Sequence, residues 1–237
     1  MIFPYEDPID IGALLELDDL KLEAARILEL LEGHITERRR ARIDAVIAER
    51  TYTVVPVMDQ IYDTGNVAAV LRTSEGLGYA AAAVIESAEQ KSSQRITQGA
   101  DKWVDIARFS TPAECIDDLK SRNFQIVATH LEASVPLHTI DFTRPTAIVF
   151  GNERDGVCEE VLDASDYRCV IPMLGFVQSF NISVAAAISL HHILLLRTAR
   201  LGAQGDLSEA QQRILKAVYY LKAVNEGHRL IPRLLDQ

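Results

Sequence analysis

The stretch T53-V-V-P-V-M-D-Q-I-Y-D-T-G-N-V-A-A-V-L-R-T73 contains the first expected β-strand and most of the helix that follows it. Residues 53–58 form a short apolar run, which is typical of a strand buried on both faces. A polar segment then separates this run from a helical pattern over residues 66–77. This strand-to-helix unit sets the pattern for the middle of the chain.

Short Val-, Ile- and Ala-rich runs continue to alternate with helical segments up to residue 200. Further strands are expected at 80–86, 105–109, 124–129, 146–150 and 168–172, and further helices at 112–121, 157–164 and 181–200. Such alternation predicts an α/β fold with a mainly parallel sheet flanked by helices. Thr111 and Ser208 each precede a helix and have Glu or Gln three residues later, which predicts two capping boxes.

Auxiliary helices are expected on both sides of this region. Amphipathic spacing predicts one helix over 14–32, a second over about 36–49 and a last one after Ser208. The expected domains are an N-terminal helical extension (1–50), an α/β domain (51–200) and a C-terminal helical tail (201–237).

Composition favours a soluble protein of the cytoplasm. The chain has 237 residues, of which 48% are hydrophobic, enough for a sizeable core. Its three cysteines are widely spaced and odd in number, which argues against a disulfide framework or a zinc pair. The amino terminus lacks the pattern of a secretory signal. Polar residues interrupt the apolar segment 182–196, so we expect a buried helix and no membrane span.

The net charge of −10 is distributed unevenly. Residues 1–32 hold nine acidic and two basic residues, so this leader carries −7 and the remainder only −3. A run of arginines follows the leader: Arg38, Arg39, Arg40 and Arg42. By itself such a run is a solvated helix face or a set of contacts to phosphates.

Several familiar site patterns are incomplete in this chain. The glycines of G76-L-G-Y-A-A81 follow a helix instead of a strand, which argues against a dinucleotide fingerprint. Gly151 and Gly156 have the spacing of a phosphate-binding loop, but Val157 and Cys158 replace its Lys-Ser/Thr pair. No group of residues has metal-ligand spacing, and no Gly-x-Ser-x-Gly elbow is present, so we expect neither a metal site nor a serine hydrolase.

Polar residues remain at three strand ends. Asn66 is interpreted first as the cap of the helix that carries Arg72. Gly151 lets the backbone approach a ligand, and Glu153 follows it in a tight turn. Ser179 and Asn181 stand at the head of the helix expected at 181–200. Each feature alone is common where a strand ends or a helix begins. Their occurrence together and in this order is specific enough to indicate a family.

This ordered set resembles the SPOUT class of RNA 2′-O-methyltransferases, and in particular its TrmH-like tRNA (guanosine-2′-O)-methyltransferase branch, which modifies a D-loop guanosine. The resemblance is carried by N66-x5-R-T73, by F150-G-N-E-x-x-G156 and by I171-P-M-x-G-x-V-Q-S-x-N-x-S-V-A185. The segment T36-E-R-R-R-A-R-I-D44 is similar to the basic amino-terminal helix of that branch. The likeness extends over about residues 36–200.

The resemblance implies a C-terminal trefoil knot, a homodimer and binding of S-adenosylmethionine. Knots are rare exceptions in protein topology, so periodicity does not predict one. The residues implied for the methyl donor are Thr129, His130, Leu131, Gly151, Ile171, Met173 and Phe180. Those implied for catalysis are Arg72, Asn66, Glu153, Ser179 and Asn181, and those implied for RNA binding are Arg38, Arg39, Arg40, Arg42 and Lys102.

The implied reaction is 2′-O-methylation of a ribose, with Arg72 as the central residue. Arg72 could act as a base or hold the phosphate beside the target ribose. We favour the second role because a guanidinium normally keeps its proton. The acidic leader and the tail after residue 200 match the tRNA branch poorly. A ribosomal RNA substrate, or a non-catalytic module that binds RNA or the donor, therefore stays an alternative.

Overall fold

The computed structural model describes residues 3–86, 102–132 and 134–236. These residues form two compact units. The first, called the sheet unit below, runs from Thr51 to Gln204. The second, the helical unit, combines residues 3–50 with 205–236. The two ends of the chain, which the sequence suggested as separate extensions, thus fold together.

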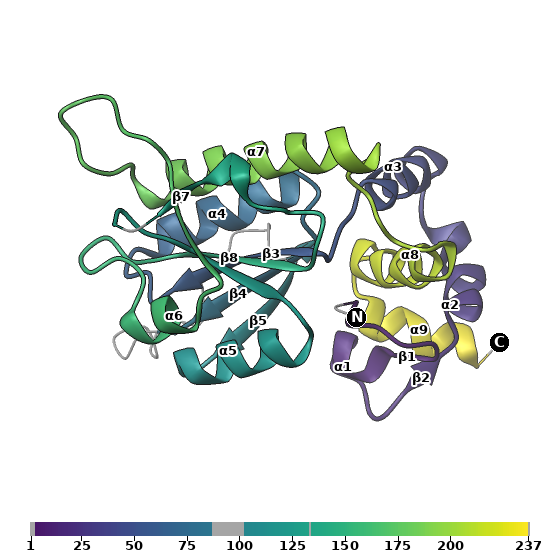
Figure 1. Cartoon of the computed structure of the whole chain (residues 1–237). Coiled ribbons are helices and arrows are strands. Elements are labelled where there is room, and N and C mark those ends of the chain that lie inside the picture. Colours follow the sequence, from purple (N-terminus) through teal and green to yellow (C-terminus); the bar gives the residue numbers. More distant parts are fainter. Residues whose placement is uncertain (1–2, 87–101, 133, 237) are drawn as a thin grey trace. The chain divides into compact units, whose positions relative to one another are not determined.

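A parallel sheet forms the centre of the sheet unit (Figure 1). Its described strands are β3 (Val54–Asp59), β4 (Ala81–Ile85), β5 (Asp105–Phe109), β6 (Gln125–Thr129), β7 (Val135–Pro136), β8 (Thr146–Phe150) and β9 (Tyr167–Val170). Their order is β5-β4-β3-β8-β6-β9-β7, and every neighbouring pair is parallel. The prediction of a mainly parallel α/β sheet is confirmed; the two-residue strand β7 was not predicted.

Helices cover both faces of this sheet. They are α4 (Thr64–Gly76), α5 (Pro112–Ser121), α6 (Glu159–Ala164) and α7 (Ile182–Leu201), with a short 3-10 turn, η4 (Leu137–Thr139). Helices α4 and α7 contact each other on one face, and α5 and α6 contact each other on the other (Figure 1). The prediction that helices flank the sheet is therefore confirmed for both of its faces.

Burial explains the apolar strands. The central strands β3 and β8 are buried along their whole length, as expected for strands with helices on both faces. Helix α7 contributes Ala186, Leu190 and Ile193 to the same core, whereas Val184 and Ile188 are exposed, so the helix that was predicted to be buried is buried on one face only. By length and composition α7 could also cross a bilayer, a test that core helices of soluble proteins pass as well.

The first helix of the sheet unit is capped by Asp63, so the prediction that Asn66 caps it is wrong. The Asp63 carboxylate accepts a hydrogen bond from the Gly65 N–H at 2.8 Å. Asn66 lies inside the first turn of α4, and its side chain is available for other contacts. At α5, Thr111 is the N-cap as predicted, but Glu114 accepts a hydrogen bond from the Ser110 N–H and does not close a capping box on Thr111.

The helical unit contains two short strands and several helices. Its described elements are β1 (Ile9–Asp10), α1 (Ile11–Leu15), β2 (Lys21–Leu22), α2 (Ala24–Leu31), η1 (Glu32–His34), α3 (Glu37–Ala48), α8 (Glu209–Ala223) and α9 (Gly227–Leu235). Helix α8 packs against both α2 and α3. Its capping box between Ser208 and Gln211 is present as predicted, whereas α9 was not predicted.

The predicted helix over residues 14–32 is wrong. Helix α1 ends where Glu16 adopts a left-handed conformation with φ of 54°, and the chain then turns back so that the Leu20 carbonyl accepts from Ile11 and Gly12. A new helix starts at Ala24, whose N–H donates to the Asp7 carboxylate at 2.8 Å. The apolar spacing was helical on both sides of this turn, so periodicity did not reveal the break.

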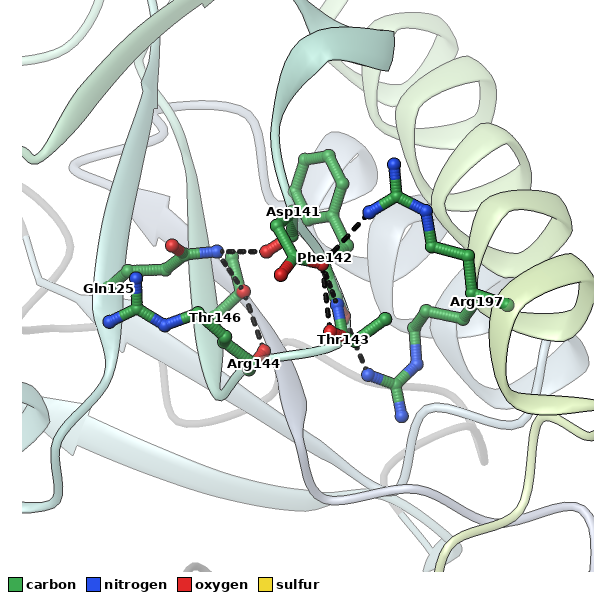
Figure 2. A network of polar contacts seen from close by, with 8 residues as sticks. Gln125, Asp141, Phe142, Thr143, Arg144, Thr146 and Arg197 are labelled. Carbon is green, nitrogen blue, oxygen red and sulfur yellow. Dashed lines mark hydrogen bonds and ion pairs between the residues drawn. The ribbon is translucent and has the colours of Figure 1, made fainter.

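A buried arginine ties α7 to the loop before β8 (Figure 2). Arg197 is 1% exposed, and its guanidinium donates a hydrogen bond to the Phe142 carbonyl at 2.7 Å. Close by, the Gln125 amide donates to the Asp141 carbonyl at 2.7 Å and to the Thr146 hydroxyl at 2.8 Å. Because β6 and β8 begin here, this network closes the amino edge of the sheet.

Replacement of Arg197 by methionine should lower the free energy of unfolding by roughly 1.5–3 kcal/mol, the usual contribution of a hydrogen bond to a charged group. The reason is that the Phe142 carbonyl would lose its buried donor. Urea unfolding followed by circular dichroism measures the change. Arg200→Met is the matched control, because Arg200 is half-exposed in its ion pair with Asp141; an equal loss in both variants would contradict a special role for Arg197.

Candidate active site at the junction of β3 and β8

The sheet has a switch point between its two central strands. After β3 the chain passes through α4 to β4 on one side, and after β8 it passes through α6 to β9 on the other. In open parallel sheets, the two loops that diverge at such a point leave a crevice at the carboxyl ends of the strands, where ligands bind. The segments that follow β3 and β8 are those that carry Asn66 and Glu153.

A chain of hydrogen bonds joins residues from the three polar motifs at this point. The Asn66 Nδ2 donates to the Glu153 Oε1 at 2.6 Å. The Asn181 Nδ2 donates in turn to the Asn66 Oδ1 at 3.3 Å. Asn181 is also the N-cap of α7, as its position suggested, and accepts from the Ser183 N–H. Three residues predicted from separate motifs thus lie together.

The turn that presents Glu153 is held by its own backbone. Asn152 and Gly156 exchange two backbone hydrogen bonds of 3.0 and 3.1 Å. The Asn152 side chain accepts from two N–H groups inside the turn, those of Arg154 and Asp155. A side chain at Gly151 would overlap the backbone of Gly156 and Val157, and Gly156 has a φ of 75°. Both glycines are therefore required by geometry.

The far end of this turn is fixed by Asp59, a residue that no sequence pattern had signalled. Asp59 is the fully buried last residue of β3 and accepts a hydrogen bond from the Cys158 N–H at 2.8 Å. Burial, reinforced by the nearby Asp59 carboxylate, raises the pKa of the Cys158 thiol to about 11. Cys158 is thus a neutral thiol at physiological pH and not a nucleophile.

Arg72 and Ser179 stand apart from the hydrogen-bonded chain. Arg72 is exposed on α4, and six residues of helix separate it from Asn66 by about 9 Å along the axis. Among the described residues, Arg72 has no hydrogen-bond or ion-pair partner. Ser179 is exposed in the loop that leads into α7, which stands clear of the sheet in Figure 1. Arg72 is therefore available to a ligand.

Of the residues implied for the methyl donor, all except Phe180 lie at or just after the carboxyl ends of β8, β6 and β9, in a part of the sheet where β6 pairs with both β8 and β9. The Thr129 hydroxyl donates to the Val149 carbonyl at 3.0 Å, and the His130 N–H donates to the Cys169 carbonyl at 2.9 Å. Leu131 exposes apolar surface just after β6, and Phe180 does so in the loop that precedes α7. Gly151 follows β8, and Ile171 and Met173 follow β9.

The residues expected to bind RNA are divided between the two units. Lys102 lies 5.3 Å from the Trp103 ring centroid and precedes β5, so it is at the amino edge of the sheet, away from the Asn66–Glu153 pair. Helix α3 carries the arginine run. Within it Arg40 is paired with Glu32 at 2.5 Å, whereas Arg38 and Arg42 are exposed. In the described part of the chain no cluster of potential metal ligands occurs.

A parallel α/β fold with a polar site at its switch point is typical of proteins that bind nucleotides or related cofactors. A family model described as the SpoU rRNA Methylase family matches residues 53–191. The chain therefore belongs to this family. The resemblance found in the sequence motifs is confirmed.

Relatives and solved structures agree with this assignment. The tRNA (guanosine(18)-2′-O)-methyltransferase of Aquifex aeolicus is 34% identical over 207 residues, which cover 85% of this chain and 98% of the relative. The enzyme of the same name from Thermus thermophilus is 38% identical over 204 residues, which cover 85% of this chain and 94% of the relative.

The crystal structure of the A. aeolicus TrmH/SpoU tRNA modifying enzyme matches with a TM-score of 0.70 and 33% identity, covering 80% of this chain and 98% of that one. The SpoU methyltransferase AviRb from Streptomyces viridochromogenes, solved in complex with the cofactor AdoMet, matches with a TM-score of 0.56 and 24% identity, covering 65% and 62%. At this identity AviRb supports the fold.

Proposed function

We propose that this protein transfers a methyl group from S-adenosylmethionine to the ribose 2′-hydroxyl of guanosine 18 in tRNA. The observation that carries the proposal is the chain Asn181–Asn66–Glu153, which joins all three motifs at the switch point of the sheet. Relatives that align over almost their whole length are named for this reaction. Guanosine 18 is the D-loop guanosine expected from the sequence motifs.

The strand ends of β8, β6 and β9 fit the donor by their chemistry. The residues that would hold S-adenosylmethionine are Thr129, His130, Leu131, Gly151, Ile171 and Met173 at these strand ends, together with Phe180 from the loop before α7. Most offer apolar side chains or backbone groups, a suitable set for an adenosyl group. Gly151 brings bare backbone to this surface because the turn leaves no space for a side chain. When bound, the donor supplies an electrophilic methyl group.

The remaining task of the protein is to position the ribose and its phosphate. Arg72 is exposed and free of described partners, so its guanidinium would hold the phosphate beside the target ribose. Glu153, fixed by the Asn66 amide, would orient the ribose hydroxyl. Alignment of reacting groups can contribute about 7–11 kcal/mol to a barrier. Ser179 and Asn181 would shape the entrance to the donor site.

The enzyme is further proposed to be a homodimer. Helix α7 exposes Val184, Ile188 and Leu195, which recur on one face of the helix. The preceding loop exposes Leu174 and Phe176 almost completely. Exposed apolar side chains gathered on one helix face mark an interaction site, and a second copy of the chain can cover them through a twofold axis.

Ile188→Glu should weaken this dimer at least tenfold, or by about 1.4 kcal/mol, because it places a charge inside the apolar interface. Sedimentation velocity over a range of concentrations measures the shift toward monomer. Ala107→Glu serves as the control, since Ala107 is exposed on β5 at the far edge of the sheet. A monomeric wild-type protein, or a dimer unaffected by Ile188→Glu, would refute the proposed interface.

The arginines of α3 are proposed to contact RNA phosphates. The double variant Arg38→Ala/Arg42→Ala should make the salt dependence of RNA binding shallower, with the log–log slope reduced by about 1.5. Fluorescence anisotropy with labelled tRNA at several KCl concentrations gives the slope. Arg26→Ala is the control, because Arg26 is already paired with Glu29 on α2; an unchanged slope in the double variant would leave α3 as a solvated helix.

Transfer of tritium from labelled S-adenosylmethionine tests the proposed reaction. Unmodified tRNA transcripts and ribosomal RNA fragments are offered separately, and the methylated nucleotide is mapped. Label at guanosine 18 of tRNA is the expected result. Label in ribosomal RNA alone would identify the other substrate class, and donor binding without transfer to any RNA would indicate a binding module.

The proposed setting is the cytoplasm, with no membrane partner. The cysteines of the chain, Cys115, Cys158 and Cys169, are all free thiols. Free thiols suit a reducing compartment. Helix α7, the most apolar segment, directs residues such as Leu190 and Ile193 into the core of the sheet unit and packs on α4.

A further inference from the structure

A second contact crosses the switch point beside the Asn66–Glu153 pair. The Arg154 guanidinium carbon lies 4.5 Å from the centroid of the Tyr62 ring. Tyr62 belongs to the loop between β3 and α4, and Arg154 belongs to the turn after β8. Tyr62 lies four residues before Asn66, and Arg154 directly follows Glu153, so the two contacts join the same two stretches of chain.

The Tyr62–Arg154 pair has the properties of a binding surface. Arg154 is exposed and Tyr62 is half-buried, so the ring forms a base on which the guanidinium rests. Among the described residues no carboxylate forms an ion pair with Arg154. The nearby acids have other contacts or face solvent: Glu153 binds Asn66, Asp63 caps α4, and Asp155 is exposed.

The backbone of Arg154 is fixed as well as its side chain. Its N–H donates to the Asn152 Oδ1 at 3.0 Å, inside the turn that Gly151 and Gly156 make possible. A guanidinium held over an aromatic ring loses little further freedom when it binds, and its planar donors match a phosphate. The guanidinium is thus preorganised for an anionic group that enters beside Glu153.

We propose that Arg154, supported by Tyr62, binds the phosphodiester of a nucleotide that flanks the target ribose. This inference rests on the proposed function, because it places the RNA strand at the carboxyl edge of β3 and β8. Glu153 and Arg154, which are consecutive residues of one turn, would then contact different parts of the RNA. Glu153 faces the target ribose, and Arg154 holds the adjoining backbone, a contact that positions the RNA without reading its sequence.

Steady-state kinetics with unmodified tRNA at saturating S-adenosylmethionine tests the proposal. Arg154→Ala should raise the KM for tRNA roughly tenfold while kcat changes by less than about twofold, as expected for loss of a binding contact. The log–log salt slope of tRNA binding should become shallower by about one. Arg154→Lys should restore the slope but only part of the KM, since an ammonium lacks the planar donors.

Variants of the ring separate the role of Tyr62 from that of its hydroxyl. Tyr62→Phe should behave as wild type, whereas Tyr62→Leu should raise the KM for tRNA because the guanidinium loses its support. Arg144→Ala is the matched control: Arg144 is an exposed arginine of the same unit, placed before β8 at the opposite edge of the sheet. Thermal melting of each variant checks that these surface changes leave the fold intact.

The inference is overturned if Arg154→Ala leaves both the KM for tRNA and the salt slope unchanged, or if Arg144→Ala changes them equally. A loss of S-adenosylmethionine affinity in Arg154→Ala at unchanged tRNA binding would also overturn it, by assigning Arg154 to the donor site. Failure of the proposed function gives a different result, because the wild-type enzyme would then methylate no RNA at all.

Discussion

Arg72→Ala should reduce methyl transfer by at least about a hundredfold while the affinity for S-adenosylmethionine stays within about twofold of wild type. The separation is expected because Arg72 is exposed on α4, without a described partner, and does not belong to the strand ends that would hold the donor. Single-turnover transfer assays and isothermal titration with the donor give the two quantities. Loss of both together would show that Arg72 supports the fold or the donor site.

The variant Arg72→Lys distinguishes a positioning role from a base. A lysine keeps the positive charge but not the planar pair of donors, so a positioning residue should retain partial activity with an unchanged pH profile. A residue that removes the ribose proton should instead move the pH profile of kcat, because an ammonium loses its proton far more readily than a guanidinium. Whether the pH profile shifts therefore decides between the two roles.

Gly151→Ala should abolish donor binding and methyl transfer together. The added methyl group would overlap the backbone of Gly156 and Val157, so the turn must open. Overpacking of this kind typically costs about 1–3 kcal/mol of stability, and here it would also displace Glu153 from Asn66. Equilibrium titration with the donor and thermal melting measure the two effects.

The matched control for this substitution is Gly76→Ala. Gly76 ends α4 with open space around its missing side chain, and alanine favours the helix. This variant should keep full activity and equal or higher stability. Donor affinity that survives in Gly151→Ala would show that the turn tolerates a side chain and that its geometry does not form the donor site.

The strands other than β7 were predictable because each is a short apolar run that begins or ends near a turn or a helical segment in the sequence. The strand order, in contrast, could not be predicted from the sequence. Strand β8 pairs with β3 although the two are far apart in the chain, and no local sequence pattern indicates this pairing. The meeting of Asn66 with Glu153, and of Tyr62 with Arg154, depends on this neighbour relation. Motif resemblance found the first pair, whereas the second had no motif to signal it.

Two local predictions failed for different reasons. Asp63 took the N-cap that Asn66 was expected to fill, and sequence alone does not rank these two capping side chains. The helix expected over 14–32 is interrupted by a chain reversal after Glu16, which the helical apolar spacing on both sides did not reveal. The trefoil knot stays a prediction from the resemblance, since strand order and pairing do not specify how segments thread.

The division of the helical unit between the two ends of the chain has a consequence for synthesis. Helices α2 and α3 leave the ribosome first, yet the helix they pack against, α8, follows the whole sheet unit. The apolar faces of α2 and α3 therefore stay exposed to solvent while the ribosome synthesises residues 51–204. We expect the acidic side chains of residues 1–32 to keep the nascent chain soluble during this interval. A chain truncated after residue 204 should expose the apolar faces of α2 and α3 and aggregate more readily.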